Sequence, residues 1–377
     1  MQIHQSAFTE LLNKTKKSFS NICPYILQNT ILLLQLILLK ETVNLHKLKN
    51  HVGSLLGNSS TEAGSHYKRL TRFFCGHFQQ YVLWKLLLFW SVSLVWEKIE
   101  QCKAEKILLL DASSWELGCC KFQFLVLSVL YQGNSIPIFF INLSKKGHSN
   151  FSERKRLFQM ALKCYDLRGF TLLADREYIG RDWLLWLDNQ EINFVIRLPY
   201  KVYRGDIVEG GLSYEKLTNR ARKGKYTATK VRMGNKVFRM VATKAIRDGH
   251  QLLLLVTNLR NKKARKICKL YRKRWKIESM FLHWKSNGLH IEDLNFKNQR
   301  KVRLVIALLI SAYILCITEG IAHLKKIPKK KKGNLSLYYS IFAKGYQVMA
   351  KGLNDFVLFL ECINQKFNRK KQRLKPT

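Results

Sequence analysis

The feature that most constrains the fold is a series of short apolar runs between residues 107 and 198. Each run has β-type composition: Ile107–Leu110, Lys121–Tyr131, Ile136–Leu143, Phe170–Ala174 and Ile192–Leu198. Gln132-Gly133-Asn134-Ser135 supplies hairpin chemistry between the second and third runs. Asn150 and Glu153 open a helix after the third run, and Arg181–Asn189 forms another before the last. The predicted order is three hairpin-like strands, a helix, a strand, a helix and a strand, which makes an α/β domain.

This order of elements is that of the ribonuclease-H-like folds. Residues 199–250 interrupt it with short β-type stretches and turns, which predict an all-β insertion. A buried strand at Gln251–Thr257 and a long helix over about 262–286 then follow. We therefore expect a helical region at 1–103, an interrupted α/β domain at 104–320 and a basic helical region at 321–377.

The charge of the chain indicates a polyanionic partner. Lys and Arg number 66 against 25 Asp and Glu, a formal net charge of +41. Such an excess repels itself unless a polyanion is bound, and nucleic acid is the first candidate before an anionic membrane surface. The apolar stretches Ile26–Leu39, Tyr81–Trp96 and Leu304–Thr318 are interrupted or short, so we expect buried core helices and no membrane span. Nine cysteines without a CxxC pair fit a reducing cytoplasm.

Two helices are expected near the N-terminus, over Thr42–Gly57 and Ser60–Phe74. Gly57 suits a helix end, and Ser59 with Glu62 predicts a capping box for the second helix. A basic second helix after a tight turn is typical of a helix-turn-helix, and an ordinary helical hairpin with a solvated basic face explains it equally well. In the first case Leu70 and Phe74 pack inward, and DNA contacts come from His66, Lys68, Arg69 and Arg72.

The predicted helix at 262–286 carries an unusual stripe. Tyr271, Arg274, Glu278 and Lys285 follow one another at steps of three, four and seven positions. At about 100° per residue they fall within one narrow face beside a buried apolar face. One acid beside an Arg, a Tyr and a Lys indicates a site in which Glu278 holds a cation and its neighbours hold phosphates. The alternative is that Glu278 only pairs with Arg274.

Two aspartates upstream supply further carboxylates. Asp111 and Asp175 each end an apolar run, in ILLLD and FTLLAD. Either one alone is more simply a turn or cap residue. Together with Glu278 they offer three carboxylates that could converge, and hard cations such as Mg²⁺ prefer oxygen ligands. Two such ions activate a nucleophile and stabilise a leaving oxygen on phosphate.

At these residues the sequence resembles the DDE transposases of bacterial insertion sequences, specifically the insertion-sequence-4 family. That family carries Tyr, two residues, Arg, three residues, Glu, six residues and Lys, and Tyr271, Arg274, Glu278 and Lys285 match this spacing. LLADREYIG also fits the family, and LLLDASSWELG fits more loosely, with Ser113 where Thr is common. The resemblance covers about residues 100–320.

The resemblance implies a ribonuclease-H-like catalytic domain at 104–320. In it Asp111, Asp175 and Glu278 form the metal-binding triad for two Mg²⁺ or Mn²⁺ ions, while Tyr271, Arg274 and Lys285 contact DNA near the cleavage site. Residues 1–103 would bind the element end. The expected partners are double-stranded DNA of the element ends and target, and a second protomer in the DNA complex, in the bacterial cytoplasm at the nucleoid.

The favoured function is accordingly a transposase that cleaves element ends and joins them to target DNA by metal-dependent phosphoryl transfer. The alternative is a non-catalytic, sequence-specific DNA-binding protein derived from a transposase.

Overall fold

The structure is a computed structural model that describes residues 22–57, 60–102, 104–117, 120–143, 145, 147–207, 214–222, 226–244, 252–324 and 340–355. The chain divides into two compact units. We call residues 101–115 and 121–281 the sheet unit, and residues 1–100, 116–120 and 282–377 the helical unit.

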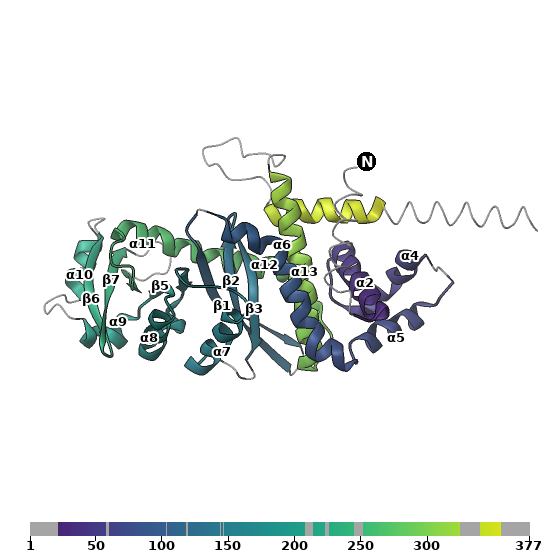
Figure 1. Cartoon of the computed structure of the whole chain (residues 1–377), viewed down its shortest axis with the longest axis horizontal. Helices are drawn as coiled ribbons and strands as arrows, with labels where there is room; N and C mark the ends of the chain where they lie inside the picture. The colour runs from purple at the N-terminus through teal and green to yellow at the C-terminus, as the bar shows by residue number, and fades with distance from the viewer. Residues whose placement is uncertain are drawn as a thin grey trace, which may run out of the picture. The chain divides into compact units, whose positions relative to one another are not determined.

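Within the described residues, eight strands of the sheet unit form one mixed sheet (Figure 1) in the order β3-β2-β1-β4-β5-β8-β7-β6. The strands are β1 (Ile107–Leu117), β2 (Cys120–Tyr131), β3 (Asn134–Asn142), β4 (Thr171–Ala174), β5 (Asn193–Arg197), β6 (Thr227–Met233), β7 (Lys236–Lys244) and β8 (Leu252–Thr257). β4 pairs in parallel with both β1 and β5, whereas β8 pairs antiparallel with β5. The first five strands are consistent with the predicted ribonuclease-H-like core.

Helices connect and cover these strands. α7 (Phe151–Leu162) packs on β3, and α8 (Arg181–Asn189) packs on β5. α11 (Ala264–Tyr271) contacts β5 and β7 and leads toward α12 (Trp275–Trp284). The start of α7 is as predicted, because Asn150 and Glu153 form a reciprocal capping box. The hairpin between β2 and β3 is also confirmed, with Gln132 and Gly133 at positive φ in its two-residue turn.

The predicted all-β insertion is wrong in two respects. β6, β7 and β8 continue the core sheet beyond β5 and so do not form a separate β domain. The segment also contains the short helix α9 (Tyr200–Tyr203) and the helix α10 (Tyr214–Arg222), which packs on β6, β7 and β8. Leu217 and Ala221, four residues apart on α10, are buried and supply its apolar face.

Two predicted boundaries are also corrected. β1 does not end at Asp111 but runs on to Leu117, because Ser113 and Trp115 continue the alternation of buried residues. The long helix at 262–286 is broken by a 3-10 turn at Arg272–Arg274, which contacts β4. No Pro or Gly marks this break, so local propensity predicts a continuous helix there.

The helical unit is built around α13 (Gln299–Ala322), which packs on α6 (Trp84–Glu100) and α2 (Pro24–Lys40). α13 is long and apolar enough to cross a membrane, but 83% of that stretch is buried within the protein, as expected of a core helix. Further helices of this unit are α3 (Leu45–Leu48), α4 (Val52–Leu56) and α5 (Ala63–Phe73).

The N-terminal helices differ from the prediction. α5 begins at Ala63 after Glu62, which makes no side-chain capping bond. Ser59 lies outside the described residues, so the predicted box of Ser59 and Glu62 stays a prediction. The predicted helix over Thr42–Gly57 is split into α3, a 3-10 turn and α4. Gly57 does end it, with φ 65°. The functional division at residues 103 and 320 stays a prediction. α13 packs with the N-terminal helices α2 and α6, although most of it lies before residue 320.

Candidate active site

Parallel pairing places the two predicted aspartates on neighbouring strands, at the point where the pairing of β1 with β4 ends. Leu110 of β1 is in register with Ala174 of β4, so Asp111 and Asp175 follow directly at the same edge of the sheet. Ala174 is likewise in register with Ile196 of β5. Because the carboxyl ends of parallel strands share one edge, β5 presents its last residue, Arg197, beside Asp175.

Asp111 lies in a largely buried position. Its Oδ1 accepts hydrogen bonds from the backbone N–H of Ala112 at 2.9 Å and from the hydroxyl of Tyr178 at 3.2 Å. Burial raises the pKa of Asp111 to about 6, and the nearby Arg274 guanidinium opposes that rise. A carboxyl held in this way keeps its proton at higher pH than a solvated one does.

Arg274 is the cation at the centre of the site. Its Nη2 donates to Glu278 Oε1 at 2.5 Å, and its Nη1 lies 3.6 Å from Asp111 Oδ2. Its side chain is only 14% exposed. Burial opposes the charge of Arg274, yet its pKa is raised, because Tyr271 and the carboxyls of Asp175, Glu278 and Asp111 all lie near enough to act on it. The three predicted acids therefore converge on one guanidinium.

The three acids do not form one ligand set. In the described part of the chain, no group of three or more His, Cys, Asp or Glu side chains is arranged to hold a metal ion. The chemistry of the donors nevertheless fits a hard divalent cation, because all three are carboxylates and Asp111 Oδ2 and Glu278 Oε1 already face one shared positive charge.

Two residues of this site were missed by the sequence reasoning. Arg197 Nη1 lies 3.8 Å from Asp175 Oδ1, and Tyr178 donates to Asp111. Arg197 sits near the end of an apolar run, and the strand-end rule that selected Asp175 would have found it if applied to basic residues. Tyr178 lies within the ADREY segment, but its partner on β1 is 67 positions away, and only the strand pairing reveals it.

Tyr271 and Lys285 occupy different surroundings. Tyr271 is buried, and its hydroxyl donates to Asp175 Oδ1 at 3.3 Å, which with burial raises its pKa. Lys285 follows α12 and forms an ion pair with Glu292 at 3.4 Å. The predicted contacts of Tyr271, Arg274 and Lys285 with DNA stay predictions.

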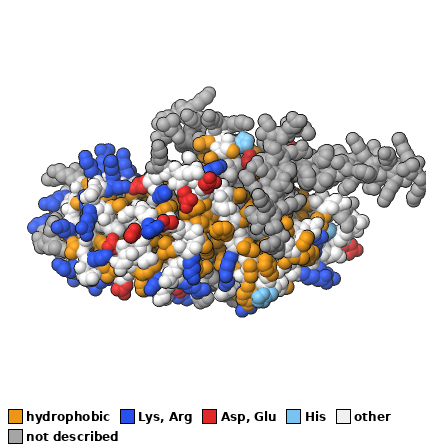
Figure 2. Space-filling model, viewed as in Figure 1, with side chains coloured by type: hydrophobic (Ala, Val, Ile, Leu, Met, Phe, Trp, Pro, Cys, Tyr) orange, Lys and Arg blue, Asp and Glu red, His pale blue; other side chains and the backbone are white. Residues whose placement is uncertain are grey.

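The side of α11 and the following turn that faces solvent is strongly basic. Six exposed cations lie there: Arg265, Lys266, Lys269, Arg272, Lys273 and Lys276. We call this set the α11 ridge. Figure 2 shows Lys and Arg side chains gathered over this part of the sheet unit. Among described residues, none of the six has a carboxylate within ion-pair distance. Like charges three or four residues apart on a helix repel, so the ridge suits a polyanion.

The basic residues of α5 are not equivalent. Lys68 and Arg72 are exposed, whereas Arg69 donates through Nε to Oδ1 of the buried Asn29 at 2.8 Å. His66 is buried, so the expectation that it faces DNA is wrong. Leu70 and Phe74 are buried as predicted.

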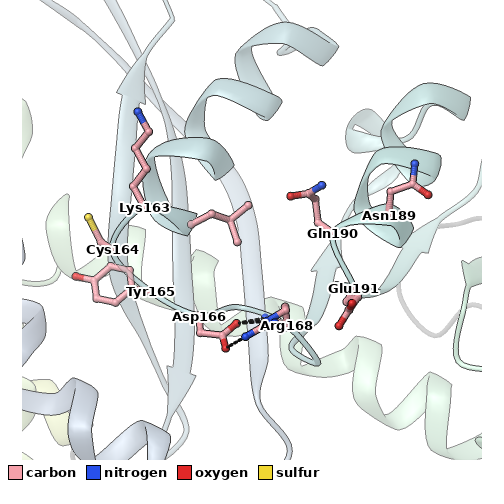
Figure 3. A pocket seen from close by; sticks show the side chains of 9 residues that line it. Lys163, Cys164, Tyr165, Asp166, Arg168, Asn189, Gln190 and Glu191 are labelled. Atoms are coloured by element: carbon pink, nitrogen blue, oxygen red, sulfur yellow. Dashed lines mark hydrogen bonds and ion pairs between the residues drawn. The ribbon is translucent and has the colours of Figure 1, made fainter.

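A pocket of about 560 Å³ lies away from the acids (Figure 3). Its walls come from the segments that precede β4 and β5, so it lies at the opposite edge of the sheet from Asp175. Asp166 and Arg168 form a two-bond ion pair there, and these bonds lower the pKa of Asp166 to about 2. None of the three acids of the candidate site lines this pocket, and we assign it no role in the chemistry.

Comparison with known proteins gives the family of the chain. Residues 103–315 match the family model described as Transposase DDE domain, so the chain belongs to that family of DNA transposition proteins. No curated protein matches. A solved structure of the piggyBac transposase synaptic complex with hairpin DNA is similar, with 11% identity and a TM-score of 0.46, over 94% of this chain and 73% of that one.

Proposed function

We propose that the chain is an active transposase of the insertion-sequence-4 type, which cleaves the ends of its element and joins them to target DNA. The observation that carries the proposal is the convergence of Asp111, Asp175 and Glu278, from β1, the end of β4 and α12, on the guanidinium of Arg274. Three carboxylates near the largely buried guanidinium of Arg274 are the groups that bind a divalent cation and a phosphate.

The carboxylates of Asp111, Asp175 and Glu278 would hold two Mg²⁺ or Mn²⁺ ions. When bound, these ions activate the attacking oxygen and stabilise charge on the leaving oxygen. With Asp111 and Glu278 engaged in this way, the guanidinium of Arg274 would hold a phosphate of the strand being cut. Arg197 lies on the other side of Asp175, where it can take a second phosphate oxygen.

DNA binding is supported by charge. The segment 261–303 holds 14 Lys and Arg against three Asp and Glu. The α11 ridge concentrates six of these cations on one exposed surface. We propose double-stranded DNA as the partner, two protomers in the DNA complex, and the bacterial nucleoid as the place of action.

The proposal is tested with Asp111→Asn, Asp175→Asn and Glu278→Gln. Each variant removes a cation ligand and adds no negative charge, so DNA binding should be retained while strand cleavage is lost. Nicking of labelled element-end DNA in Mg²⁺ or Mn²⁺ is measured beside a gel-shift assay. A Glu278→Gln protein that cleaves like wild type would show that Glu278 is not a cation ligand of the active site.

The second candidate function is a DNA-binding protein without catalysis. The alternative is supported by the arrangement of the acids, which do not form one ligand set among the described residues. The two functions differ in one result: the non-catalytic protein would bind element-end DNA and leave it uncut at every metal concentration.

A further inference from the structure

Each aspartate of the site accepts hydrogen bonds from the same two kinds of donor, the backbone N–H of the next residue and a tyrosine hydroxyl. Asp111 Oδ1 accepts from the N–H of the next residue, Ala112, at 2.9 Å and from the Tyr178 hydroxyl at 3.2 Å. Asp175 Oδ1 accepts from the N–H of the next residue, Arg176, at 2.7 Å and from the Tyr271 hydroxyl at 3.3 Å. At Asp111 the other oxygen, Oδ2, faces the positive charge of Arg274.

Tyr178 reaches Asp111 through the turn that follows Asp175. Asp175 begins a 3-10 turn over Arg176–Tyr178, and its carbonyl accepts the backbone N–H of Tyr178 at 3.0 Å. This turn directs the ring from the end of β4 to Asp111 on the neighbouring strand β1. Tyr178 is 1% exposed, so its ring is fixed by packing. Three residues and one hydrogen bond thus connect the two aspartates.

Two donors on Oδ1 have a chemical consequence. They fix the rotation of the carboxyl group and occupy lone pairs of one oxygen, so that Oδ2 is the oxygen left to meet a cation. Hydrogen bonds of this kind to a ligating carboxylate typically affect metal affinity by about 10- to 100-fold.

We propose that Tyr178 is a positioning residue, which orients Asp111 so that Oδ2 is presented to a divalent cation. This role rests on the proposed function. Tyr178 itself contacts neither the cation nor DNA; it acts through the carboxyl of Asp111. The three-residue step from Asp175 to Tyr178 therefore ties the orientation of the Asp111 carboxyl to the position of Asp175.

The test is Tyr178→Phe in the full chain, which removes the hydroxyl and keeps the ring. Mn²⁺ affinity is measured by electron paramagnetic resonance without DNA, and thermal unfolding is measured in metal-free buffer. We expect the Mn²⁺ dissociation constant to rise about 10-fold or more while the unfolding temperature stays near that of wild type. Cleavage should fall at low Mn²⁺ and recover at high Mn²⁺.

Tyr313→Phe is the matched control. Tyr313 is also 1% exposed, but it lies on α13 in the helical unit. The Tyr313→Phe protein should bind Mn²⁺ with the same affinity as wild type.

Wild-type Mn²⁺ affinity in Tyr178→Phe would overturn the proposal, and so would an equal loss in Tyr313→Phe. A lower unfolding temperature with cleavage that no Mn²⁺ concentration restores would assign Tyr178 a purely structural role and also overturn it. A wild-type protein that neither binds Mn²⁺ nor cleaves DNA would instead refute the proposed function, which keeps the two failures distinct.

Discussion

Replacement of Arg274 by Gln should destabilise the metal-free protein and make it more responsive to Mg²⁺. Arg274 neutralises Glu278 at 2.5 Å and Asp111 at 3.6 Å from a largely buried position. Removing one partner of a fully buried ion pair costs about 3–5 kcal/mol. The loss is limited here because Asp111, with its pKa near 6, can take up a proton. At pH 7.5 that protonation costs about 2 kcal/mol, at about 1.4 kcal/mol per pH unit.

Glu278 is more exposed than Asp111, so its lost pair adds about 1 kcal/mol. The expected total is about 3 kcal/mol, which lowers the unfolding temperature of a unit of this size by about 6–12 °C. Mg²⁺ should then raise the unfolding temperature of Arg274→Gln more than that of wild type, because the cation no longer competes with a guanidinium.

The assay is thermal unfolding followed by circular dichroism, with and without Mg²⁺. Arg274→Lys serves as control, since it keeps one positive charge but loses the two-pronged geometry, and it should fall between the other two proteins. Equal metal-free unfolding temperatures for wild type and Arg274→Gln, or equal gains from Mg²⁺, would refute the role given to Arg274.

Three further predictions follow from the charges. The folded pKa of Asp111, about 6, exceeds its ordinary value of 3.8, so its contribution to stability is fully present below about pH 4 and is lost as the pH rises through 6. In metal-free buffer, wild type should lose up to about 3 kcal/mol relative to Asp111→Asn over that range, and parallel denaturant-derived stability curves would contradict this. Replacing Arg265, Lys269 and Arg272 of the α11 ridge by Gln should reduce the slope of log K for DNA binding against log salt by about 3, at about 0.9 per phosphate contact. The control, Arg156→Gln with Lys163→Gln, should leave this slope unchanged. An unchanged slope in the α11 ridge variant would show that DNA binds elsewhere. Lys68→Ala with Arg72→Ala should reduce discrimination between element-end and scrambled DNA. Arg69→Ala should mainly lower the free energy of unfolding, by about 1–3 kcal/mol, because it removes the hydrogen bond to Asn29. Unaltered discrimination in the double variant would show that recognition does not depend on α5.

Local patterns predicted the framework of the site well. Apolar runs that end in Asp111 and Asp175 gave strands that pair in parallel, and that pairing places both acids at one edge. The hairpin at Gln132-Gly133 and the helix opened by Asn150 depend on neighbouring residues alone, which is why composition and spacing were sufficient there.

The features that were missed depend on distant contacts. The bond from Tyr178 to Asp111 exists only once β1 and β4 are paired. The turn at Arg272–Arg274 breaks a continuous helical pattern where the chain contacts β4. His66 shows the same limit, because its burial is set by helices that pack on α5 and not by the basic residues beside it.

The central claim is that these acids carry out strand transfer on DNA. The most direct measurement uses a labelled element end with a free 3′-hydroxyl, a supercoiled target plasmid and Mg²⁺, with wild type and Glu278→Gln compared at equal DNA occupancy. We predict that wild type produces labelled plasmid in which the end is covalently joined, and that Glu278→Gln binds both DNAs without joining them. Binding of both DNAs by wild type with no joined product at any Mg²⁺ or Mn²⁺ concentration would contradict the account.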